Sequence, residues 1–214
     1  MTNVLPEWWG PLLDRVSMAR AEDFTRLVTP DDGGRPSAVL ILLADDGPEG
    51  PDVLLVRRAR GMRNHAGQPA FPGGAVDPDD ADVVATALRE SNEEVGLDPE
   101  TVDVQSTLPA LWIPVSGFVV TPVLARWRAP HPVAPVDLNE VDLVARVPIA
   151  HLANPVNRLR LRHRSGWIGP AFRTDDMLVW GFTAGILTKL LDLGGWARPW
   201  DSAGPPEDLP VGGS

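Results

Sequence analysis

Cysteine is absent from this chain of 214 residues, so disulfides, zinc–thiolate centres and cysteine nucleophiles are excluded. The sequence also lacks an apolar run of about 18 residues, the length expected of a membrane-spanning helix. Its first residues hold neither a basic segment nor a long apolar one, and they predict no secretory signal. Together with the lack of cysteine, which fits a reducing compartment, these features predict a cytoplasmic protein without a membrane partner.

Positive charge is scarce, since 19 lysines and arginines stand against 29 acidic residues and give a net charge of −10. This balance argues against nucleic acid as a general partner. No serine has the context of a nucleophile elbow, so serine hydrolase chemistry is not supported. The hydrophobic content of 43% and the charged content of 22% are those of an ordinary globular protein, and the length suffices for one domain with a sizeable core.

The most informative segment is the run LRESNEEVGL at residues 88–97. In a helix, Glu90, Glu93 and Glu94 share one face, where like charges repel by roughly 0.2–0.5 kcal/mol per pair. Gly96 is expected to end that helix, so the carboxylates also face the negative end of the helix dipole, at roughly 0.3–1 kcal/mol per charge. A solvent-exposed acidic face is one interpretation of this cluster. The other is an oxygen-ligand site for a hard divalent cation such as Mg²⁺.

A glycine-rich turn and an acidic loop precede this helix. The turn is the segment FPGG at residues 71–74, and the loop is DPDD at residues 77–80. The helix is expected to begin near Asp82, with Asp79 or Asp80 capping its N-terminus. A glycine-rich turn, a helix and a carboxylate cluster in this order are typical of a unit that holds a metal ion beside a phosphate.

This unit resembles the Nudix box, whose pattern is G-x5-E-x7-R-E-U-x-E-E-x-G-U with U apolar. The matching residues are Gly74, Arg89, Glu90, Glu93, Glu94, Gly96 and Leu97. Two positions depart from the pattern, because Asp80 stands one residue too far before Arg89 and Ser91 stands at an apolar position. The resemblance implies that the three glutamates bind Mg²⁺ or Mn²⁺, with the Gly73 carbonyl as a further ligand. It also implies that Arg89 orients one of the glutamates through a salt bridge.

A further catalytic carboxylate from a distant loop is also implied by the resemblance. Glu140 is the candidate, followed by Asp142, and a plain surface acid at the start of a strand is the alternative for Glu140. The resemblance implies that the metal ions lower the pKa of a bound water, which then attacks phosphorus. The general base among Glu90, Glu93, Glu94 and Glu140 stays open.

The segment upstream of the box is similar to the signature of the coenzyme A diphosphatase branch of this family, LLT-x-R-[SA]-x3-R-x3-G-x3-FPGG. The matches are Leu54, Leu55, Arg58, Ala59, Arg63, Gly67, Phe71, Pro72, Gly73 and Gly74, while Val56 replaces the threonine. The segments Trp180–Ala184 and Ser116–Phe118 are also similar to this branch. Because the two signatures overlap at one glycine pair with the correct spacing, together they are more specific than either alone.

The resemblance implies hydrolysis of the diphosphate bond of coenzyme A or its thioesters, to 3′,5′-ADP and 4′-phosphopantetheine or its acyl form. Arg58 and Arg63 can pair with phosphate oxygens through a bidentate fork. His65 is a candidate phosphate donor or an ordinary loop histidine, and Gly67 allows close backbone approach or forms a plain turn. The glycines at 73–74 complete the expected substrate site.

Two basic clusters can attract an anionic substrate to an acidic protein. They consist of Arg57, Arg58, Arg60 and Arg63, and of Arg158, Arg160, Arg162 and Arg164. The first cluster leads directly into the predicted site, whereas a solvated face is the alternative for both.

Two other functions stay open. One is a Nudix hydrolase that acts on another nucleoside diphosphate derivative, such as ADP-ribose or NADH. The other is a Nudix-like nucleotide-binding module without turnover. A small-molecule nucleotide is the expected partner in each case, and the resemblance also allows a homodimer, for which the eight tryptophans leave room.

Apolar strands and helical segments alternate along the chain. Strands are expected at residues 37–44, 53–56, 102–108, 115–127, 141–147 and 159–164, and helices at 7–27, 82–95, 149–152 and 176–193. The resemblance implies the Nudix α/β/α sandwich with a central mixed β-sheet. The expected organisation is an N-terminal helical extension at 1–30, the Nudix domain at 31–196 and a mobile tail rich in proline and glycine at 197–214.

Overall fold

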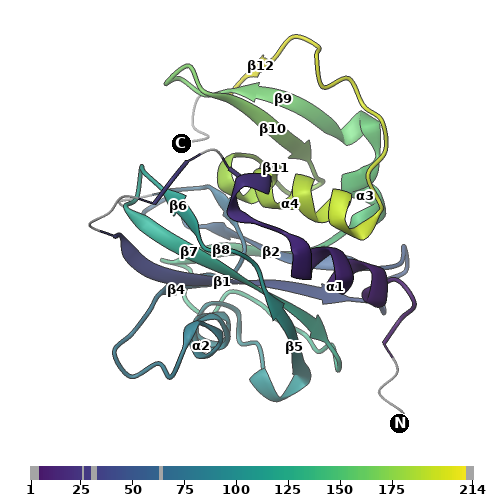
Figure 1. The fold of residues 1–214 in the computed structure, drawn as a ribbon. Coiled ribbons are helices and arrows are strands. Elements are labelled where there is room, and N and C mark those ends of the chain that lie inside the picture. The colour runs from purple at the N-terminus through teal and green to yellow at the C-terminus, as the bar shows by residue number, and fades with distance from the viewer. Residues whose placement is uncertain (1–4, 26, 30–32, 63–64, 211–214) are drawn as a thin grey trace.

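The computed structural model of the protein describes residues 5–25, 27–29, 33–62 and 65–210. Arg63, one of the predicted substrate-binding residues, lies outside these described residues. The chain folds into a central β-sheet with helices on both faces, and a second, smaller sheet lies beyond one helical layer (Figure 1). The predicted α/β sandwich with a central mixed sheet is therefore confirmed.

The elements follow one another in an alternating order. The central sheet contains β1 (Arg35–Ala44), β2 (Asp52–Arg58), β3 (Pro69–Ala70), β4 (Gly73–Ala75), β5 (Val102–Thr107), β6 (Leu111–Ile113), β7 (Phe118–Trp127) and β8 (Val141–Pro148). The second sheet contains β9 (Arg158–Arg162), β10 (Ile168–Arg173), β11 (Leu178–Val179) and β12 (Glu207–Asp208). The α-helices are α1 (Trp9–Met18), α2 (Val83–Val95), α3 (Ile149–Ala153) and α4 (Gly181–Gly194).

The central sheet is mixed because β1 has neighbours of both directions. It runs parallel to β7 from Arg35 to Leu43 and antiparallel to β2 and β4. The predicted hairpin of β1 and β2 is present, but the two strands pair only beside their turn, at Leu43↔Val53 and Ala44↔Asp52. Beyond that point β1 pairs with β4 and β2 pairs with β3, so the segment that carries β3 and β4 lies between the two diverging strands.

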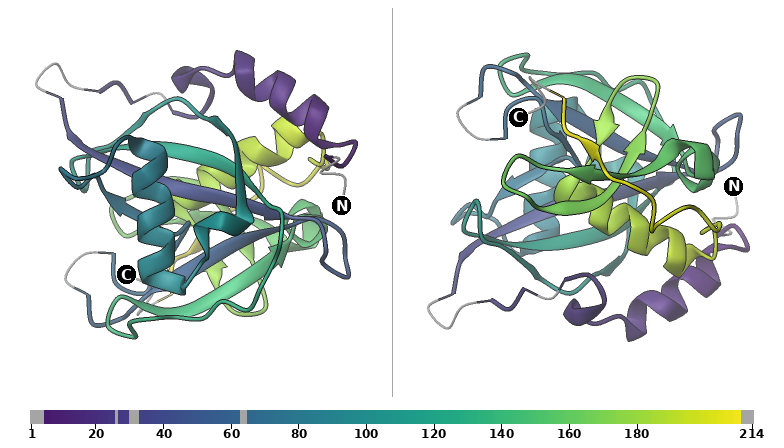
Figure 2. Two further views of the ribbon diagram at one scale, coloured as in Figure 1. Left: turned by 90° about the horizontal axis from the view of Figure 1, so that it is seen from below. Right: turned by 90° about the horizontal axis from the view of Figure 1, so that it is seen from above.

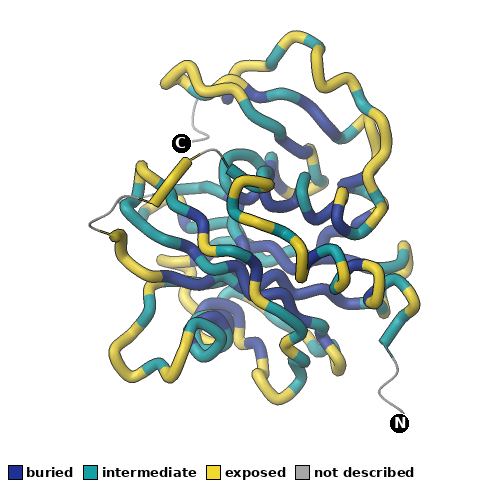
Figure 3. Tube along the Cα trace, viewed as in Figure 1, coloured by how far each residue is buried: buried dark blue, intermediate teal, exposed yellow. Residues whose placement is uncertain are grey.

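Both faces of the sheet are covered, which explains why β1 is almost continuously apolar. Leu40 and Leu42 pack in the cluster on the α2 face, whereas Ile41 and Leu43 pack in the cluster on the face of α1 and α4. Figure 2 shows α2 crossing one face of the sheet and α1 and α4 side by side over the other. The buried residues accordingly gather along the strands and on the inner sides of the helices (Figure 3).

Helix α2 begins near Asp82 and ends at Gly96, as the sequence predicts, but its N-terminal cap is not one of the two proposed residues. Gly96 is in the left-handed conformation with φ of 69°, as a helix-ending glycine requires. The N-terminal cap is Asp82, whose carboxylate accepts hydrogen bonds from the N–H groups of Val84 and Ala85 at 2.9 and 2.8 Å. The expectation of Asp79 or Asp80 as the cap is therefore wrong.

The predicted N-terminal helix packs directly on the C-terminal one. Trp9 and Leu12 of α1 are fully buried in the same cluster as Leu187 and Leu190 of α4. In the segment at 197–214, β12 pairs in parallel with β9 and Leu209 is buried. The mobility of that tail and the division into three regions stay predictions. Among the described residues, no helix has the length and apolar character needed to cross a membrane.

Candidate active site

The glycine-rich turn lies directly against the C-terminal half of α2. The N–H of Gly73 donates to Oε2 of Glu94 at 3.0 Å. Gly73 has φ of +153°, and a Cβ atom there would stand 2.3 Å from the carbonyl oxygen of Ala38. A Cβ atom on Gly74 would stand 2.4 Å from the carboxylate of Glu90. Only glycine at both positions lets the turn approach the two glutamates this closely.

Arg89 lies at the centre of an ion-pair network on the outer side of this turn. Its guanidinium makes a bidentate pair with Asp80, with Nε–Oδ1 at 2.9 Å and Nη2–Oδ2 at 3.0 Å. It also binds Glu90 and Glu93, each at 3.0 Å. Hydrogen bonding to Arg89 holds the pKa of Asp80 well below its usual range, and bonding to Asp80 raises that of Arg89.

The two departures from the Nudix box both have a structural explanation. The loop before α2 is one residue longer, yet Asp80 still reaches Arg89, and the Thr86 hydroxyl donates to its carboxylate at 2.8 Å. Ser91 is fully buried, and its hydroxyl donates to the carbonyl of Ala87 at 2.6 Å, one turn back in the helix. The extra residue is therefore accommodated in the loop, and the polar Ser91 is satisfied inside α2.

The three glutamates of α2 share a face but differ strongly in exposure. The Glu94 side chain is 6% exposed, that of Glu90 19% and that of Glu93 56%. Burial raises the pKa of Glu94 to about 7, although the Gly73 N–H and the Arg58 charge oppose the rise. Burial also raises the pKa of Glu90. Glu94, which binds the Gly73 N–H, is thus the least solvated of the three carboxylates.

Glu140 approaches the same cluster from the loop that precedes β8. Its negative charge contributes to the raised pKa values of both Glu90 and Glu94. The loop is tied to the last turn of α2 because Val136 N–H donates to the Glu94 carbonyl at 3.0 Å. Asp142, the second candidate, is instead paired with Arg57 at 2.6 Å. Of the two distant acids, Glu140 is the one whose backbone carbonyl accepts from the Ala59 N–H at 2.8 Å, next to Arg58 at the end of β2.

Arg58 stands at the end of β2 beside this cluster. Its Nη1 lies 3.8 Å from Oε1 of Glu94, and its buried Nε has no hydrogen-bond partner among the described residues. The following loop returns through Gly67, which has φ of 69° and whose N–H donates to the Arg58 carbonyl at 3.0 Å. His65 has φ of 57°, and its Nδ1 is 2.8 Å from the Gln68 side chain. Gly67 thus closes a turn that holds Arg58, and His65 contacts its own loop.

The cluster has the oxygen donors that a divalent cation prefers. Glu90, Glu94 and Glu140 crowd negative charge at the glycine turn, which a cation would offset. As the side chains stand, no three histidine, aspartate or glutamate side chains in the described part of the chain converge closely enough to hold an ion. Arg89 holds Glu90 and Glu93, and Glu94 accepts from Gly73, so metal binding requires these side chains to turn.

The Gly73 carbonyl ligand and the metal-binding roles of the three glutamates stay predictions. The sequence pattern did not reveal that the Gly73 N–H contacts Glu94, nor that Thr86 supports Asp80. Asp80 lies in the loop before α2, so helical periodicity does not predict its contact with Thr86, six residues later.

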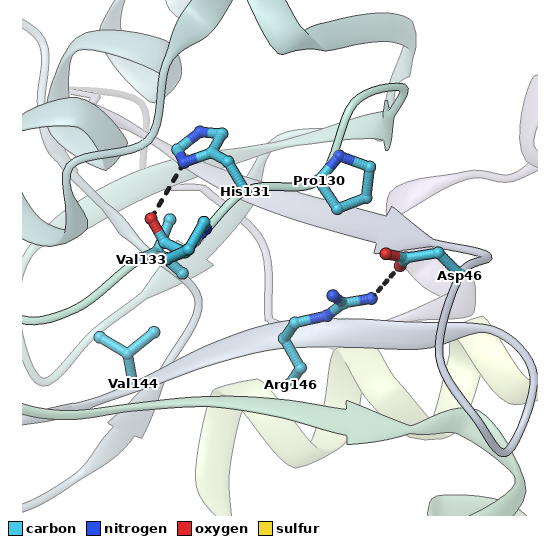
Figure 4. A pocket seen from close by; sticks show the side chains of 7 residues that line it. Asp46, Pro130, His131, Val133, Val144 and Arg146 are labelled. Atoms are coloured by element: carbon cyan, nitrogen blue, oxygen red, sulfur yellow. Dashed lines mark hydrogen bonds and ion pairs between the residues drawn. The ribbon is translucent and has the colours of Figure 1, made fainter.

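A cavity of about 340 Å³ lies elsewhere, and none of the predicted site residues lines it. Its walls are Asp46, Val144, Arg146 and the segment 130–133 (Figure 4). Arg146 is paired with Asp46 and Asp52, and Nε2 of His131 accepts from the Asp98 N–H at 3.1 Å. The charged side chains of this cavity are already paired with one another, and the cavity is separate from the carboxylate cluster.

Comparison with known proteins places this geometry in a family. A family model described as NUDIX domain matches residues 34–164. The chain is 40% identical over 168 residues to the uncharacterized Nudix hydrolase NudL of Cronobacter sakazakii, covering 73% of this chain and 81% of that protein. It is 41% identical over 169 residues to the NudL protein of Escherichia coli, with the same two shares.

Solved structures of low sequence identity agree on the fold. The Nudix hydrolase RenU of M. Smegmatis superposes with a TM-score of 0.54 at 20% identity, over 78% of this chain and 93% of RenU. A MutT/nudix family protein from Enterococcus faecalis gives a TM-score of 0.53 at 15% identity, over 88% of this chain and 74% of that one. These two likenesses show the fold alone.

Proposed function

Because the chain belongs to the Nudix hydrolase family, whose members act on diphosphate bonds and generally need divalent metal ions, we propose that its substrate is coenzyme A or a coenzyme A thioester. Water adds across the P–O–P linkage, so that one phosphorus gains an oxygen from water and the other keeps the bridging oxygen. The products are 3′,5′-ADP and 4′-phosphopantetheine or its acyl form.

The observation that carries this proposal is an arginine with unused donors beside a carboxylate cluster. The guanidinium of Arg89 donates hydrogen bonds to Asp80, Glu90 and Glu93. Its role in this proposal is therefore to hold these side chains and not to bind substrate. Among the described residues, Arg58 has one long ion pair, to Glu94, and its Nε has no hydrogen-bond partner. A guanidinium with free N–H donors favours the binding of an oxyanion. In this proposal, a phosphate group of the substrate is that oxyanion.

The metal ligands in this proposal are Glu90, Glu93 and Glu94, with Glu140 as the carboxylate from the distant loop. A bound Mg²⁺ or Mn²⁺ ion would neutralise diphosphate oxygens and lower the pKa of a coordinated water. Glu94, held by the Gly73 N–H, fixes the position of the cluster relative to the turn. Glu140, whose charge acts on Glu94, would accept the proton of the attacking water.

The choice of coenzyme A rests on the segment upstream of the turn. Coenzyme A carries a 3′-phosphate beyond its diphosphate, so it needs more positive charge than a plain dinucleotide. Arg57 is occupied by Asp142, but Arg58 retains unused donors and Arg60 is exposed without an ion pair among the described residues. These residues lie in the stretch that is similar to the coenzyme A diphosphatase signature.

Mass spectrometry of reaction products tests the proposal. The protein is incubated with Mg²⁺ or Mn²⁺ and a mixture of coenzyme A, acetyl-coenzyme A, ADP-ribose and NADH. Release of 3′,5′-ADP together with phosphopantetheine or its acetyl form is the expected result. Cleavage of ADP-ribose or NADH alone would reject the substrate but keep diphosphate hydrolysis, and no product with either metal would favour a binding module.

A further inference from the structure

The first turn of α4 makes a buried contact with the strand that leads into the glycine turn. Thr183 is 4% exposed, and its hydroxyl donates to the carbonyl oxygen of Pro69 at 2.9 Å. The two residues are 114 positions apart in the sequence. Helix α4 also lies beyond residues 34–164, the part of the chain that the family model matches.

Packing reinforces this hydrogen bond at the next residues of the chain. Phe71, two residues after Pro69, is 2% exposed and belongs to the same core cluster as Val179 and Ala184. Val179 and Ala184 flank Thr183 on β11 and α4. The segment from Pro69 to Phe71 is therefore joined to α4 by one hydrogen bond, and its Phe71 lies in the core cluster that it shares with that helix.

The following two residues are fixed by other elements. The Pro72 carbonyl accepts from the Leu40 N–H at 2.8 Å, and the Gly73 N–H donates to Glu94 at 3.0 Å. Gly73 has no room to move toward β1, because even a Cβ atom would stand 2.3 Å from the Ala38 carbonyl. Only three residues separate Pro69 from Gly73, so a shift of the chain at Pro69 is expected to strain the hydrogen bond between the Gly73 N–H and Glu94.

We infer that Thr183 is a positioning residue for the reaction. Its hydroxyl holds the Pro69 carbonyl, and through the segment that follows it sets where Gly73 presents its N–H to Glu94. Thr183 touches no reacting group in this account, and it acts only through the turn. The inference rests on the proposed metal-dependent hydrolysis for its kinetic readout, whereas metal affinity gives a readout that is independent of the substrate.

The test compares Thr183→Val with a matched control on the same helix. Thr188 also donates its hydroxyl to a carbonyl, that of Ala184 at 2.8 Å, but this bond lies within α4. Thr183→Val and Thr188→Val therefore delete the same hydroxyl group. Only Thr183→Val also deletes a contact to Pro69, in the strand that leads into the glycine turn. Thr183→Ser keeps the donor and serves as the rescue variant.

The kinetic constants with coenzyme A and the Kd for Mn²⁺ are measured on the intact chain, the latter by electron paramagnetic resonance. All measurements are made well below the melting temperature of each variant. Thr183→Val is expected to lose about tenfold or more in kcat with little change in KM, because misplacing a reacting group by about 1 Å can cost about 100-fold. Its Kd for Mn²⁺ is expected to rise about threefold or more, while Thr183→Ser and Thr188→Val stay within about twofold of the unmodified chain.

The inference is overturned if folded Thr183→Val matches Thr188→Val in both kcat and Mn²⁺ affinity. Should Thr183→Val not fold, Thr183→Ala compared with Thr183→Ser isolates the hydroxyl in the same way. If the unmodified chain cleaves none of the diphosphate substrates, the proposed function fails and the Mn²⁺ affinities alone decide the role of Thr183. If the unmodified chain does not bind Mn²⁺, both proposals are rejected.

Discussion

Two groups of charged residues lie at the glycine turn, one on its outer side around Arg89 and one on its inner side around Glu94, and they differ in how their charges are paired. On the outer side, Arg89 offsets Asp80, Glu90 and Glu93 with four close contacts, and Glu93 remains largely exposed. On the inner side, Glu94 is buried, and among the described residues its nearest cation, on Arg58, stands 3.8 Å away. The outer side is a closed network of ion pairs, and the inner side is where we propose that a cation and a phosphate bind. The buried carboxylate of the inner side is therefore expected to be essential for the chemistry of this site.

The largest effect is expected from removing a single carboxylate charge on either side. Glu94→Gln and Glu93→Gln should each lower kcat by about 100-fold or more, because both carboxylates are proposed metal ligands and charge stabilisation supplies most of the rate. Steady-state kinetics with saturating Mg²⁺ measures this loss. A kcat for Glu94→Gln within tenfold of the unmodified chain would show that the inner carboxylate is not needed for turnover.

Stability in the absence of metal should separate the same two variants. The raised pKa of Glu94, about 7 against an ordinary value of 4.5, means that the folded protein keeps a proton that the unfolded chain releases between these pH values. The free energy of unfolding therefore falls as the pH rises through this window, at a cost of about 3 kcal/mol above pH 7. Glu94→Gln should remove that cost, so that it is more stable than the unmodified chain at pH 8 and equal to it near pH 4.

Urea denaturation in the presence of a chelator measures this difference. Glu93→Gln is the control, because it loses an exposed ion pair with Arg89 and should be slightly less stable, by about 0.5 kcal/mol or less. The account of the inner side fails if Glu94→Gln is the less stable of the two at pH 8.

Breaking the outer network without touching a proposed metal ligand should have an intermediate effect. In Asp80→Asn, Arg89 loses its bidentate partner and is free to shift Glu90 and Glu93. Loss of such a supporting group typically costs about 10–100-fold in activity or metal affinity. Because the folded pKa of Asp80 is lowered, its stabilising effect is present at neutral pH and is lost as the pH falls below its ordinary value.

Both the kinetics and the acid unfolding profile of Asp80→Asn are informative. Unchanged kcat and Mn²⁺ affinity would show that the Asp80–Arg89 pair serves only the fold. A loss of stability at pH 7 that disappears at low pH would confirm the charge-dependent part of the pair.

The smallest effect is expected at Arg58, and it should depend on the substrate. Arg58→Ala is expected to raise KM for coenzyme A by about tenfold, since a charged hydrogen bond contributes roughly 1.5–3 kcal/mol. Dephospho-coenzyme A should be less affected if Arg58 contacts the 3′-phosphate. Arg57→Ala is the matched control, because Arg57 is already paired with Asp142. Equal losses on both substrates would assign Arg58 to the diphosphate instead.

Local patterns account for the parts of the site that lie on one element. The i, i+3, i+4 spacing fixes a common face for Glu90, Glu93 and Glu94, and a glycine after the last apolar residue correctly predicts the end of α2. The strands expected at 37–44 and 102–108 are long apolar or alternating runs, and they are present as β1 and β5. These features depend on periodicity, which a single sequence carries.

Parts that depend on contacts between distant elements were not predictable in this way. The strands β3, β4, β6, β11 and β12 hold two or three residues each, too few to show a period, and β3 and β4 contain proline or glycine. Three aspartates compete to cap α2, and the path of the loop selects Asp82 while turning Asp80 to Arg89. The greater burial of Glu94 among the three glutamates follows from its contact with the glycine turn. The hydrogen bond from Thr183 to Pro69 likewise joins elements that are far apart in the sequence.

The central claim, that the buried Glu94 is a ligand of the metal ion, is tested most directly by Mn²⁺ titration followed by electron paramagnetic resonance. The unmodified chain is predicted to bind Mn²⁺, and Glu94→Gln is predicted to weaken that binding by about tenfold or more. Glu100→Gln, which changes an exposed acid just beyond α2, should bind as the unmodified chain does. Equal affinity of Glu94→Gln and the unmodified chain would contradict the account.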